Sequence, residues 1–269
     1  MSDILAELFS LRGKTALVTG GGGAIGRILS RALALAGARV LIHDVDPERL
    51  AAARALVKAA GVEVETLAAD VRDPAAIKTL VDTAAAKLGG LDILVNSVGV
   101  NRRKRIDAVT PDDFDAIIGV NLRAVYFLGQ AAHPHLKRRG GGKIVNISSL
   151  SAKHAFNTIS VYAASKAAVS QLTKAQAREW AEDNIQVNAI EPGFVRTEFT
   201  RPLWDDPYRD QWFKNFIPNG RLATPDDLVG TALLLASPAS AYITGQAVAV
   251  DGGVLSGATW ENPAEARSA

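Results

Sequence analysis

The sequence contains no cysteine among its 269 residues. This absence excludes a disulfide scaffold, a thiolate nucleophile and a cysteine-ligated metal. It also fits a reducing compartment, so we expect a cytoplasmic protein. The four histidines, His43, His133, His135 and His154, show no spacing typical of metal ligands, and we expect no metal site.

Long hydrophobic runs and an excess of one charge are also missing. No uncharged apolar run reaches the roughly 18 residues that a membrane-spanning helix needs, and the first residues lack the basic region of a signal peptide. With 30 basic and 28 acidic residues, the net charge of +2 gives no general attraction for nucleic acid. We therefore expect neither a membrane nor a nucleic-acid partner.

What is present is a regular alternation of two kinds of segment. Short apolar runs alternate with amphipathic stretches that have helical spacing, which is typical of βαβ units and a parallel sheet. We predict one α/β domain over residues 1–269, with a doubly wound, seven-stranded parallel sheet. The expected strands cover residues 14–19, 39–44, 62–68, 91–96, 143–148, 185–190 and 247–250. The expected helices cover residues 25–36, 47–60, 74–88, 111–139 and 161–182. Residues 111–139 form either two helices or one helix that is bent at Pro134.

Residues 194–223 interrupt this alternation. The segment is rich in aromatic residues and too long for an ordinary connection. It leaves from the carboxyl end of a predicted strand, where α/β sheets bind ligands. We expect a small helical lid over a substrate site; an insertion that only fills its own small core is the alternative.

A glycine-rich loop follows the first predicted strand and opens a helix. Such loops let the backbone approach a phosphate at a helix N-terminus. The expected pyrophosphate contacts are Gly20, Gly23, Ala24, Ile25 and Gly26. Asp44 ends the second strand, where a carboxylate accepts hydrogen bonds from ribose hydroxyls and repels a 2′-phosphate. Because Asp46 is the better helix cap, we expect Asp44 to be free for this role and the cofactor to be NAD.

A second constellation surrounds Tyr162. Tyr162 and Lys166 are four residues apart, so they lie on one helix face. An ammonium near the phenol stabilises the phenolate and lowers the tyrosine pKa, which suits a general base. Ser149 lies 13 residues before Tyr162, at the end of a predicted strand.

Together these motifs resemble the short-chain dehydrogenase/reductase family over nearly the whole chain, from about residue 11 to 253. The resemblance implies a Rossmann fold and a catalytic set of Asn121, Ser149, Tyr162 and Lys166. Tyr162 would take the proton of a substrate hydroxyl as hydride leaves for the nicotinamide, and Ser149 would hold the substrate oxygen. Lys166 would bind the nicotinamide ribose, and Asn121 would hold a water that links Lys166 to solvent.

The resemblance also implies further cofactor contacts and an assembly. The expected contacts are Asp70 and Val71 at the adenine, Asn96 and Gly99 after the fourth strand, and Pro192, Gly193, Val195 and Thr197 at the nicotinamide. Ala24 replaces a family glycine, and Ser97 and Val98 depart from the family's Asn-Ala pair. Homotetramers are common in the family, and the helices at 111–139 and 161–182 would form one interface.

A run of four basic residues, 102–105, follows the fourth strand. Arginine grips a carboxylate with two parallel hydrogen bonds, so a sugar acid or polyol is a reasonable small-molecule substrate. In an extended segment alternate side chains face opposite sides, so one pair would face the site and the other would not. The expected substrate contacts are Arg102, Arg103, Ser149, His154, Asn157 and Tyr162.

These residues resemble the branch of gluconate 5-dehydrogenase and 2-deoxygluconate 3-dehydrogenase. Two other functions stay open. A 3-oxoacyl-carrier-protein reductase would use the basic run to dock an acidic carrier, although Asp44 argues against its usual phosphorylated cofactor. A non-catalytic dinucleotide-binding sensor would not need the complete set of four catalytic residues.

Overall fold

The computed structural model describes residues 3–198 and 200–257. Seven strands form one parallel sheet in the order β3-β2-β1-β4-β5-β6-β7, which confirms the predicted architecture. The strands are β1 (Thr15–Thr19), β2 (Arg39–Asp44), β3 (Glu65–Ala68), β4 (Ile93–Asn96), β5 (Gly142–Ile147), β6 (Ile185–Pro192) and β7 (Ala247–Val250). The strand order reverses between β1 and β4, which creates a crevice at the carboxyl ends of these strands.

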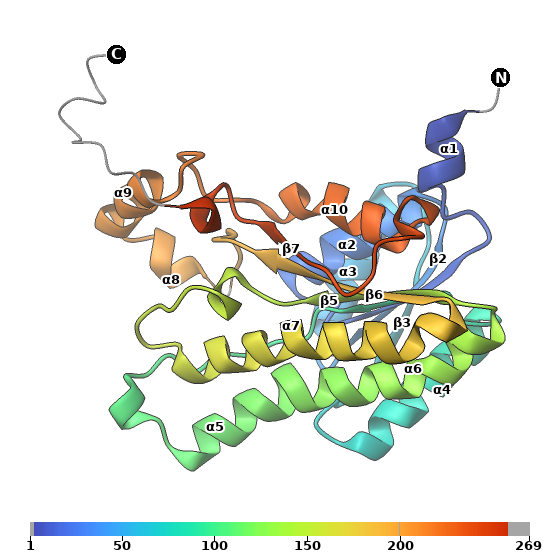
Figure 1. Ribbon diagram of the computed structural model, residues 1–269, viewed down its shortest axis with the longest axis horizontal. Helices are drawn as coiled ribbons and strands as arrows, with labels where there is room; N and C mark the ends of the chain where they lie inside the picture. Colours follow the sequence, from blue (N-terminus) through green and yellow to red (C-terminus); the bar gives the residue numbers. More distant parts are fainter. Residues whose placement is uncertain (1–2, 199, 258–269) are drawn as a thin grey trace.

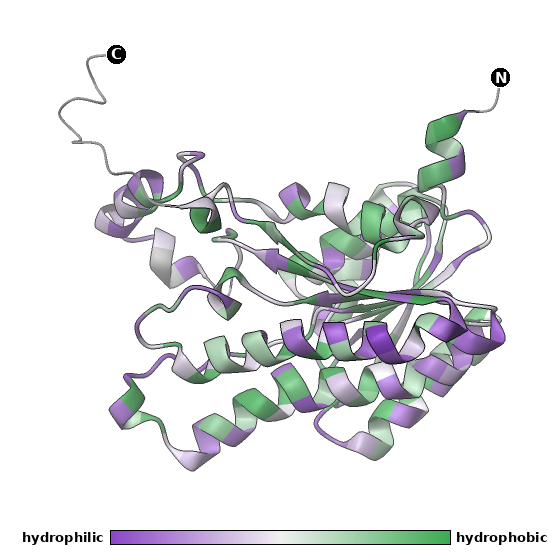
Figure 2. Cartoon of the chain, viewed as in Figure 1, coloured by the Kyte–Doolittle hydropathy of each residue, from purple (hydrophilic) through white to green (hydrophobic). Residues whose placement is uncertain are grey.

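Helices cover both faces of the sheet (Figure 1). One layer contains α2 (Ala24–Leu35), α3 (Pro47–Ala59) and α10 (Val229–Ala236). The other contains α4 (Pro74–Leu88), α5 (Pro111–Ile118), α6 (Val125–Arg138) and α7 (Ser160–Trp180). Figure 2 shows the outer helices with mixed polar and apolar residues, as expected for helices that bury one face only.

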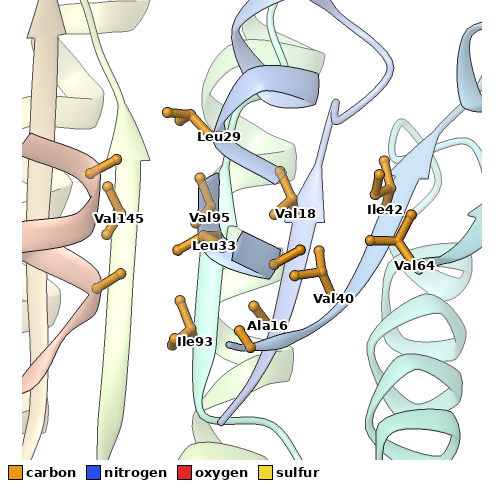
Figure 3. Close-up of a cluster of buried hydrophobic side chains, with 14 of the residues drawn as sticks. Ala16, Val18, Leu29, Leu33, Val40, Ile42, Val64, Ile93, Val95 and Val145 are labelled. Atoms are coloured by element: carbon orange, nitrogen blue, oxygen red, sulfur yellow. The ribbon is translucent and has the colours of Figure 1, made fainter. Parts of the chain in front are cut away.

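Two apolar cores lie on either side of the sheet. Alternate residues of β1 face opposite sides: Val18 packs with the α2 side, and Leu17 packs with the α4 side. Both are fully buried. In Figure 3, Val18 lies between Leu29 of α2 and the neighbouring strands. The central strands are buried on both faces, which explains why they are apolar runs rather than alternating patterns.

The predicted helix over 111–139 is divided, but not at Pro134. Pro134 lies inside α6, and the irregular segment is a π-helix, η2 (Gly119–Ala124), between α5 and α6. Asn121 lies within this π-helical turn. Such segments arise where a helix accommodates an extra residue, often at functional sites.

The structure adds short elements that the sequence analysis did not anticipate. The first described residues form a six-residue helix, α1 (Ile4–Phe9). The third strand begins at Glu65, three residues later than predicted. Among the described helices, none is both long and apolar enough to cross a membrane.

The segment after β6 is helical, as expected. It contains α8 (Arg201–Trp204) and α9 (Pro207–Phe216), which Figure 1 shows at the end of the molecule where the chain leaves β7. A third apolar cluster holds it together, and Phe194 packs edge-on against Phe156 of the segment before α7. Phe199 of the expected lid, together with residues 1–2 and 258–269 of the expected domain, lies outside the described residues.

Candidate active site

The glycine-rich loop wraps closely around the end of β1. A Cβ atom on Gly26 would lie 2.4 Å from the carbonyl oxygen of Gly20, so this close approach requires glycine. Gly20 has a φ of +66°, the left-handed region that favours glycine. α2 begins at Ala24, after Gly23, and no described side chain caps its first turn. Its first N–H groups are therefore suited to a pyrophosphate, which is the role predicted for residues 23–26.

Asp44 lies beside this loop, as predicted, but it is not free. Its Oδ2 accepts a hydrogen bond from the Gly22 amide at 3.2 Å, and its Oδ1 accepts one from the Asp46 amide at 3.1 Å. Asp46 does cap α3, as expected. A carboxylate has about four acceptor positions, so these two bonds leave capacity for ribose hydroxyls. They also orient the Asp44 carboxylate toward the glycine loop.

A basic residue, Arg49, also lies beside the glycine loop. A Cβ on Gly22 would lie 2.7 Å from the Arg49 Cβ and 2.9 Å from Asp44 Oδ2. Arg49 therefore begins next to the same glycine, although its Nε lies 3.4 Å from Asp46. The sequence separation of five residues hid this proximity, which arises because the first turn of α3 folds back over the loop.

The next group of predicted cofactor contacts is divided between surface and core. Asp70 is partly exposed and pairs with Arg72, which lowers the pKa of the Asp70 carboxyl, whereas Val71 is buried. The Asn96 side chain is fully buried: it donates to Asn146 Oδ1 at 2.9 Å and accepts from the Thr19 hydroxyl at 3.3 Å. These contacts tie three strands together, so the Asn96 side chain has a structural role in the sheet.

Gly99 faces the centre of the site. A Cβ there would lie 3.6 Å from Lys166 Nζ and 3.8 Å from Asn121 Oδ1. The segment after β6 supplies the remaining predicted cofactor contacts. Gly193 packs tightly on Asp251, Val195 is buried, and the Thr200 hydroxyl donates to the Val195 carbonyl at 2.6 Å.

Thr200 also accepts a hydrogen bond from the Thr197 amide at 3.0 Å. Thr200 therefore contacts both of the residues expected to hold the nicotinamide carboxamide. The sequence analysis missed this residue; hydroxyl residues three apart, as in Thr197 and Thr200, are a recognisable turn signal.

Tyr162, Ser149 and Lys166 come together at the carboxyl end of β5. The Ser149 hydroxyl lies near enough to the Tyr162 hydroxyl to favour the phenolate, and it accepts hydrogen bonds from the Ser151 amide and hydroxyl. Lys166 Nζ lies 5.7 Å from the centre of the Tyr162 ring and donates to the Ile147 carbonyl at 2.8 Å. The one-turn spacing on α7 produces this arrangement, as the sequence predicted.

Asn121 joins this group from the π-helical turn. Its amide donates to the Ser165 hydroxyl and to the Val100 carbonyl, each at 3.0 Å, and its Oδ1 accepts from the Val100 amide at 2.8 Å. Ser165 in turn donates to the Tyr162 carbonyl at 2.7 Å. Ser165 was not predicted, although it lies within the Tyr162–Lys166 motif. It links Asn121 to the helix turn that carries Tyr162.

Burial dominates the ionisation of the central pair. It lowers the pKa of the Lys166 ammonium to about 8. It raises the pKa of the Tyr162 phenol above its ordinary value; the nearby Ser149 hydroxyl and the charge of Arg103 oppose this rise without cancelling it. Without a cofactor, burial therefore outweighs the nearby positive charge at Tyr162; a lowered Tyr162 pKa in a closed site that holds a cationic nicotinamide stays a prediction. A further positive charge must enter the site before the phenolate is favoured.

The basic run divides by alternation, as predicted. Arg102 and Lys104 share one side, where their nitrogens lie 3.2 and 2.5 Å from the buried Asp113 carboxylate. Arg103 is exposed, but desolvation of its guanidinium lowers its pKa, and both Tyr162 and Arg209 are near enough to act on it electrostatically. Arg105 is exposed and lies 3.5 Å from Asp107. Arg103 is therefore the member of the run that interacts electrostatically with Tyr162, whereas the Arg102 guanidinium contacts Asp113.

The remaining predicted substrate contacts lie at the rim. His154 is exposed and packs its ring against Phe156 and Phe216, and Asn157 is exposed. The Lys104 amide donates to the Thr158 carbonyl at 3.0 Å, which joins the basic run to the segment before α7. Thr158 has a φ of +69°, which is rare and strained for a β-branched residue. Strain of this kind occurs at sites where the surrounding structure fixes a loop.

The arrangement of the glycine loop, Asn121, Ser149, Tyr162 and Lys166 agrees with comparisons to known proteins. A family model described as Enoyl-(Acyl carrier protein) reductase matches residues 22–255. The 2-dehydro-3-deoxy-D-gluconate 5-dehydrogenase of Bacillus subtilis is 42% identical over 94% of this chain and 98% of that protein. The chain belongs to the short-chain dehydrogenase/reductase family. It is therefore an oxidoreductase of the type that uses a nicotinamide dinucleotide.

Other members of this short-chain dehydrogenase/reductase family are similar over the same span. The gluconate 5-dehydrogenase of Gluconobacter oxydans is 38% identical over 92% of this chain and 97% of that protein. A crystal structure of a gluconate 5-dehydrogenase from Burkholderia cenocepacia, in complex with NADP and tartrate, superimposes with a TM-score of 0.90 at 40% identity. It covers 94% of this chain and 99% of that one.

Proposed function

We propose that the chain interconverts a secondary alcohol and a ketone of a sugar acid, with NAD as the preferred cofactor. The observation that carries this proposal is the convergence of Ser149, Tyr162 and Lys166 beside the glycine loop, with Arg103 interacting electrostatically with the same tyrosine. The names of the similar proteins, which act on gluconate derivatives, support the substrate class.

The residues fit a nicotinamide dinucleotide. The uncapped first turn of α2 would hold its pyrophosphate, Asp44 its adenosine ribose, and the segment from Pro192 to Thr197 its carboxamide. The adenine would lie near Asp70 and Val71. When bound, the oxidised cofactor supplies the hydride acceptor.

The chain's own residues supply the proton chemistry. Tyr162 is placed to take the proton of the substrate hydroxyl, and Ser149 holds the same oxygen by donating a hydrogen bond. Lys166 keeps an ammonium near the phenol and would hold the nicotinamide ribose when the cofactor is bound. Asn121, which lies beside Gly99 and is bonded to Ser165, is placed to hold a water for proton exchange with solvent.

The carboxylate of the substrate would meet Arg103. Its guanidinium is the member of the basic run that interacts electrostatically with Tyr162, and a guanidinium can hold a carboxylate with two charge-assisted hydrogen bonds. His154 and Asn157 lie on the adjoining segment as polar neighbours for hydroxyl groups. We propose residues 194–223 as the lid over this pocket, within a single catalytic unit of residues 1–269.

The alternative of a 3-oxoacyl-carrier-protein reductase is less well supported. That function would need the basic run to be free to dock an acidic carrier. Arg102 and Lys104 instead bind the chain's own Asp113. The sensor alternative does not explain why all four predicted catalytic side chains are brought together.

The test is an initial-rate assay with a panel of sugar acids, matched polyols and carrier-bound 3-oxoacyl substrates. We expect turnover of a sugar acid by the wild type. Arg103→Ala should raise the KM for the acid about ten- to a hundredfold with little effect on a polyol, because a charge-assisted contact is lost. Arg105→Ala is the matched control and should leave the acid-to-polyol ratio unchanged. Turnover of carrier-bound substrates alone, or cofactor binding without turnover, would reject the proposal.

NAD preference is tested in the same assay. A 2′-phosphate about 4 Å from the Asp44 carboxylate would cost about 1–4 kcal/mol of repulsion, equal to roughly a ten- to several-hundredfold preference. Asp44→Ala should narrow the preference, and Arg49→Ala should weaken NADP use more than NAD use. An NADP efficiency equal to or above that of NAD would refute the preference.

We further propose a cytoplasmic homotetramer in which α5, α6 and α7 form one interface. Phe114 of α5 and Tyr126 of α6 support this, since each is nearly half exposed despite its size. α7 adds the small exposed residues Ala164 and Ala167 to the same layer. Light scattering on the purified protein would measure the assembly.

A further inference from the structure

A fully buried carboxylate lies directly behind the candidate catalytic residues. Glu191 is the penultimate residue of β6 and has 0% exposure. It immediately precedes the segment that begins at Pro192 and is expected to meet the nicotinamide. Glutamate is almost never fully buried unless it is paired. The reaction described above does not use this group, so its position needs another explanation.

Two partners hold the carboxylate from different elements. The Ser170 hydroxyl of α7 donates to Glu191 Oε1 at 2.8 Å. On the other oxygen, Lys153 Nζ lies 2.8 Å from Oε2. The Lys153 side chain is about half exposed, whereas the Glu191 side chain is fully buried. Lys153 therefore connects the buried carboxylate to solvent.

Ser170 belongs to the catalytic face of α7. Tyr162, Lys166 and Ser170 follow one another at intervals of four residues, so they lie along one side of the helix. Ser170 Oγ is also 2.8 Å from Ser148 Oγ, and Ser148 donates to the Lys166 carbonyl at 2.9 Å. The residue after Ser148 is Ser149. Through Ser170 and Ser148, Glu191 is therefore linked to the Lys166 carbonyl and to the residue that precedes Ser149.

Lys153 belongs to the turn that carries Ser149. The short helix η3 (Leu150–Ala152) begins directly after Ser149, and the Lys153 amide closes it by donating to the Leu150 carbonyl at 3.0 Å. An ion pair between Lys153 and Glu191 therefore draws this turn toward the end of β6. Glu191 is thus ion-paired with the serine turn through Oε2, which accepts no hydrogen bond from a described residue, and accepts a hydrogen bond from the tyrosine helix on Oε1.

We propose that Glu191 is a positioning residue that fixes the Ser149 turn against the Tyr162–Lys166 face of α7. The proposal rests on the proposed dehydrogenase function. It follows from the geometry that proton transfer requires: Ser149 and Tyr162 must meet one substrate oxygen at hydrogen-bond distance. Displacement of either by a fraction of an ångström to an ångström lowers the rate steeply.

A purely structural ion pair would behave differently, and the chain offers a matched control. Asp92 is also a buried carboxylate, 5% exposed, and it pairs with Arg139 at 3.0 Å and with the Thr15 hydroxyl at 2.9 Å. It lies at the amino end of β4, the opposite edge of the sheet from Ser149. Removal of its charge should affect stability without affecting the catalytic groups.

The experiment compares Glu191→Gln, Glu191→Ala and Lys153→Met with Asp92→Asn, each assayed well below its melting temperature. For the Glu191 variants we expect kcat to fall roughly ten- to a hundredfold, with Glu191→Ala affected most. Binding of NAD, measured separately by titration, should change less than about threefold because the glycine loop is untouched. Asp92→Asn should lower the melting temperature and leave kcat near the wild-type value.

Hydrogen exchange without cofactor gives a readout that does not depend on activity. Peptides covering residues 148–154 should exchange faster in Glu191→Ala and Lys153→Met than in the wild type, and should be unchanged in Asp92→Asn. If Glu191→Ala does not fold, the double variant with Lys153→Met and Glu191→Gln replaces it. That double variant removes the buried charge together with its partner, so stability should recover while kcat stays low.

If the wild type is active and the Glu191 variants show the same kcat and the same hydrogen exchange as the wild type, the positioning role is overturned. Recovery of kcat in the double variant would also overturn the positioning role. It would show that the single variants lost activity only because an unpaired charge was left buried. An inactive wild type would instead reject the proposed function. In that case, unchanged hydrogen exchange in residues 148–154 would overturn the positioning role separately.

Discussion

Lys166 is buried at a cost to the stability of the fold. Burial lowers its pKa from an ordinary value of 10.5 to about 8. Below pH 8 the folded chain therefore carries an ammonium that water would solvate better. The penalty is greatest below the folded pKa, and it disappears as the pH rises through the unfolded value, where neither state binds the proton.

Lys166→Met should therefore stabilise the protein while it abolishes turnover. A shift of this size corresponds to about 3 kcal/mol at neutral pH, offset by about 1 kcal/mol for the lost hydrogen bond to Ile147. We expect a net gain of about 1–2 kcal/mol in unfolding free energy without cofactor. Denaturant titrations at pH 7 and pH 10 measure it. The gain should shrink at pH 10, and an equal gain at both pH values would contradict the assignment to charge burial.

Tyr162 is predicted to carry the proton transfer alone. Tyr162→Phe keeps the ring and its packing but removes the hydroxyl that meets Ser149. We expect kcat to fall at least about a hundredfold, the usual contribution of a general base. Cofactor affinity, measured by titration, should stay close to wild type. A variant that keeps more than a tenth of the activity would show that another group accepts the proton.

The sequence predicted that Ser149, Tyr162 and Lys166 lie close together because their spacing is local, whereas their catalytic roles were expected from the family resemblance and stay predictions. Tyr162 and Lys166 are fixed by one helical turn, and Ser149 by the end of a strand. The contacts of Asp44 and Arg49 with Gly22 could not be predicted, because they depend on how α3 folds back over the glycine loop. The raised Tyr162 pKa was missed for a similar reason: burial is a property of the whole site.

At the scale of elements, Asp113 connects α5 to the basic run. It is the N3 residue of a capping box with Thr110, and it also holds Arg102 and Lys104. One carboxylate thus starts a helix and orients the loop in which Arg103 lies. Lys104 extends the connection to the segment before α7 through the Thr158 carbonyl.

Asp113→Ala should release both the helix end and the loop. We expect a lower melting temperature and an increase of about tenfold in the KM for the acid substrate, because Arg103 loses its fixed position. Thr110→Ala provides the control: it breaks the capping box but keeps the Asp113 carboxylate for Arg102 and Lys104. It should lower the melting temperature with little change in KM. If Asp113→Ala and Thr110→Ala raise the KM equally, the effect on KM comes from the helix end alone and not from the contacts of Asp113 with the basic run.

Element types were predictable where the sequence signal was clear, as in the short apolar runs of the strands and the long amphipathic stretch of α7. The division of residues 111–139 was expected, but Pro134 proved to be inside a continuous helix. The actual irregularity at Gly119–Ala124 has no proline to mark it, and its single glycine, Gly119, is too weak a signal to predict a π-helical turn. It depends on the bonds that Asn121 makes to Val100 and Ser165, which are distant in sequence.

At the scale of the whole molecule, the layer of α5, α6 and α7 presents its outer surface to solvent (Figure 1). Tyr126→Glu should weaken the proposed tetramer, because it places a charge at the centre of that layer. Light scattering should then detect a species of about half or a quarter of the wild-type mass. Tyr242→Glu is the control, since Tyr242 is fully exposed in the short connection between α10 and β7. An unchanged mass for Tyr126→Glu would place the interface elsewhere.

The π-helical turn at Gly119–Ala124 sets a limit on how this chain tolerates changes of length. A π-helical turn accommodates one extra residue locally, so the helices on either side of it keep their phase. Removal of one residue from this turn would therefore leave Asp113 facing the basic run, but it would displace Asn121 from its contacts with Val100 and Ser165. A single-residue deletion there should lower catalytic activity more than it lowers the stability of the fold.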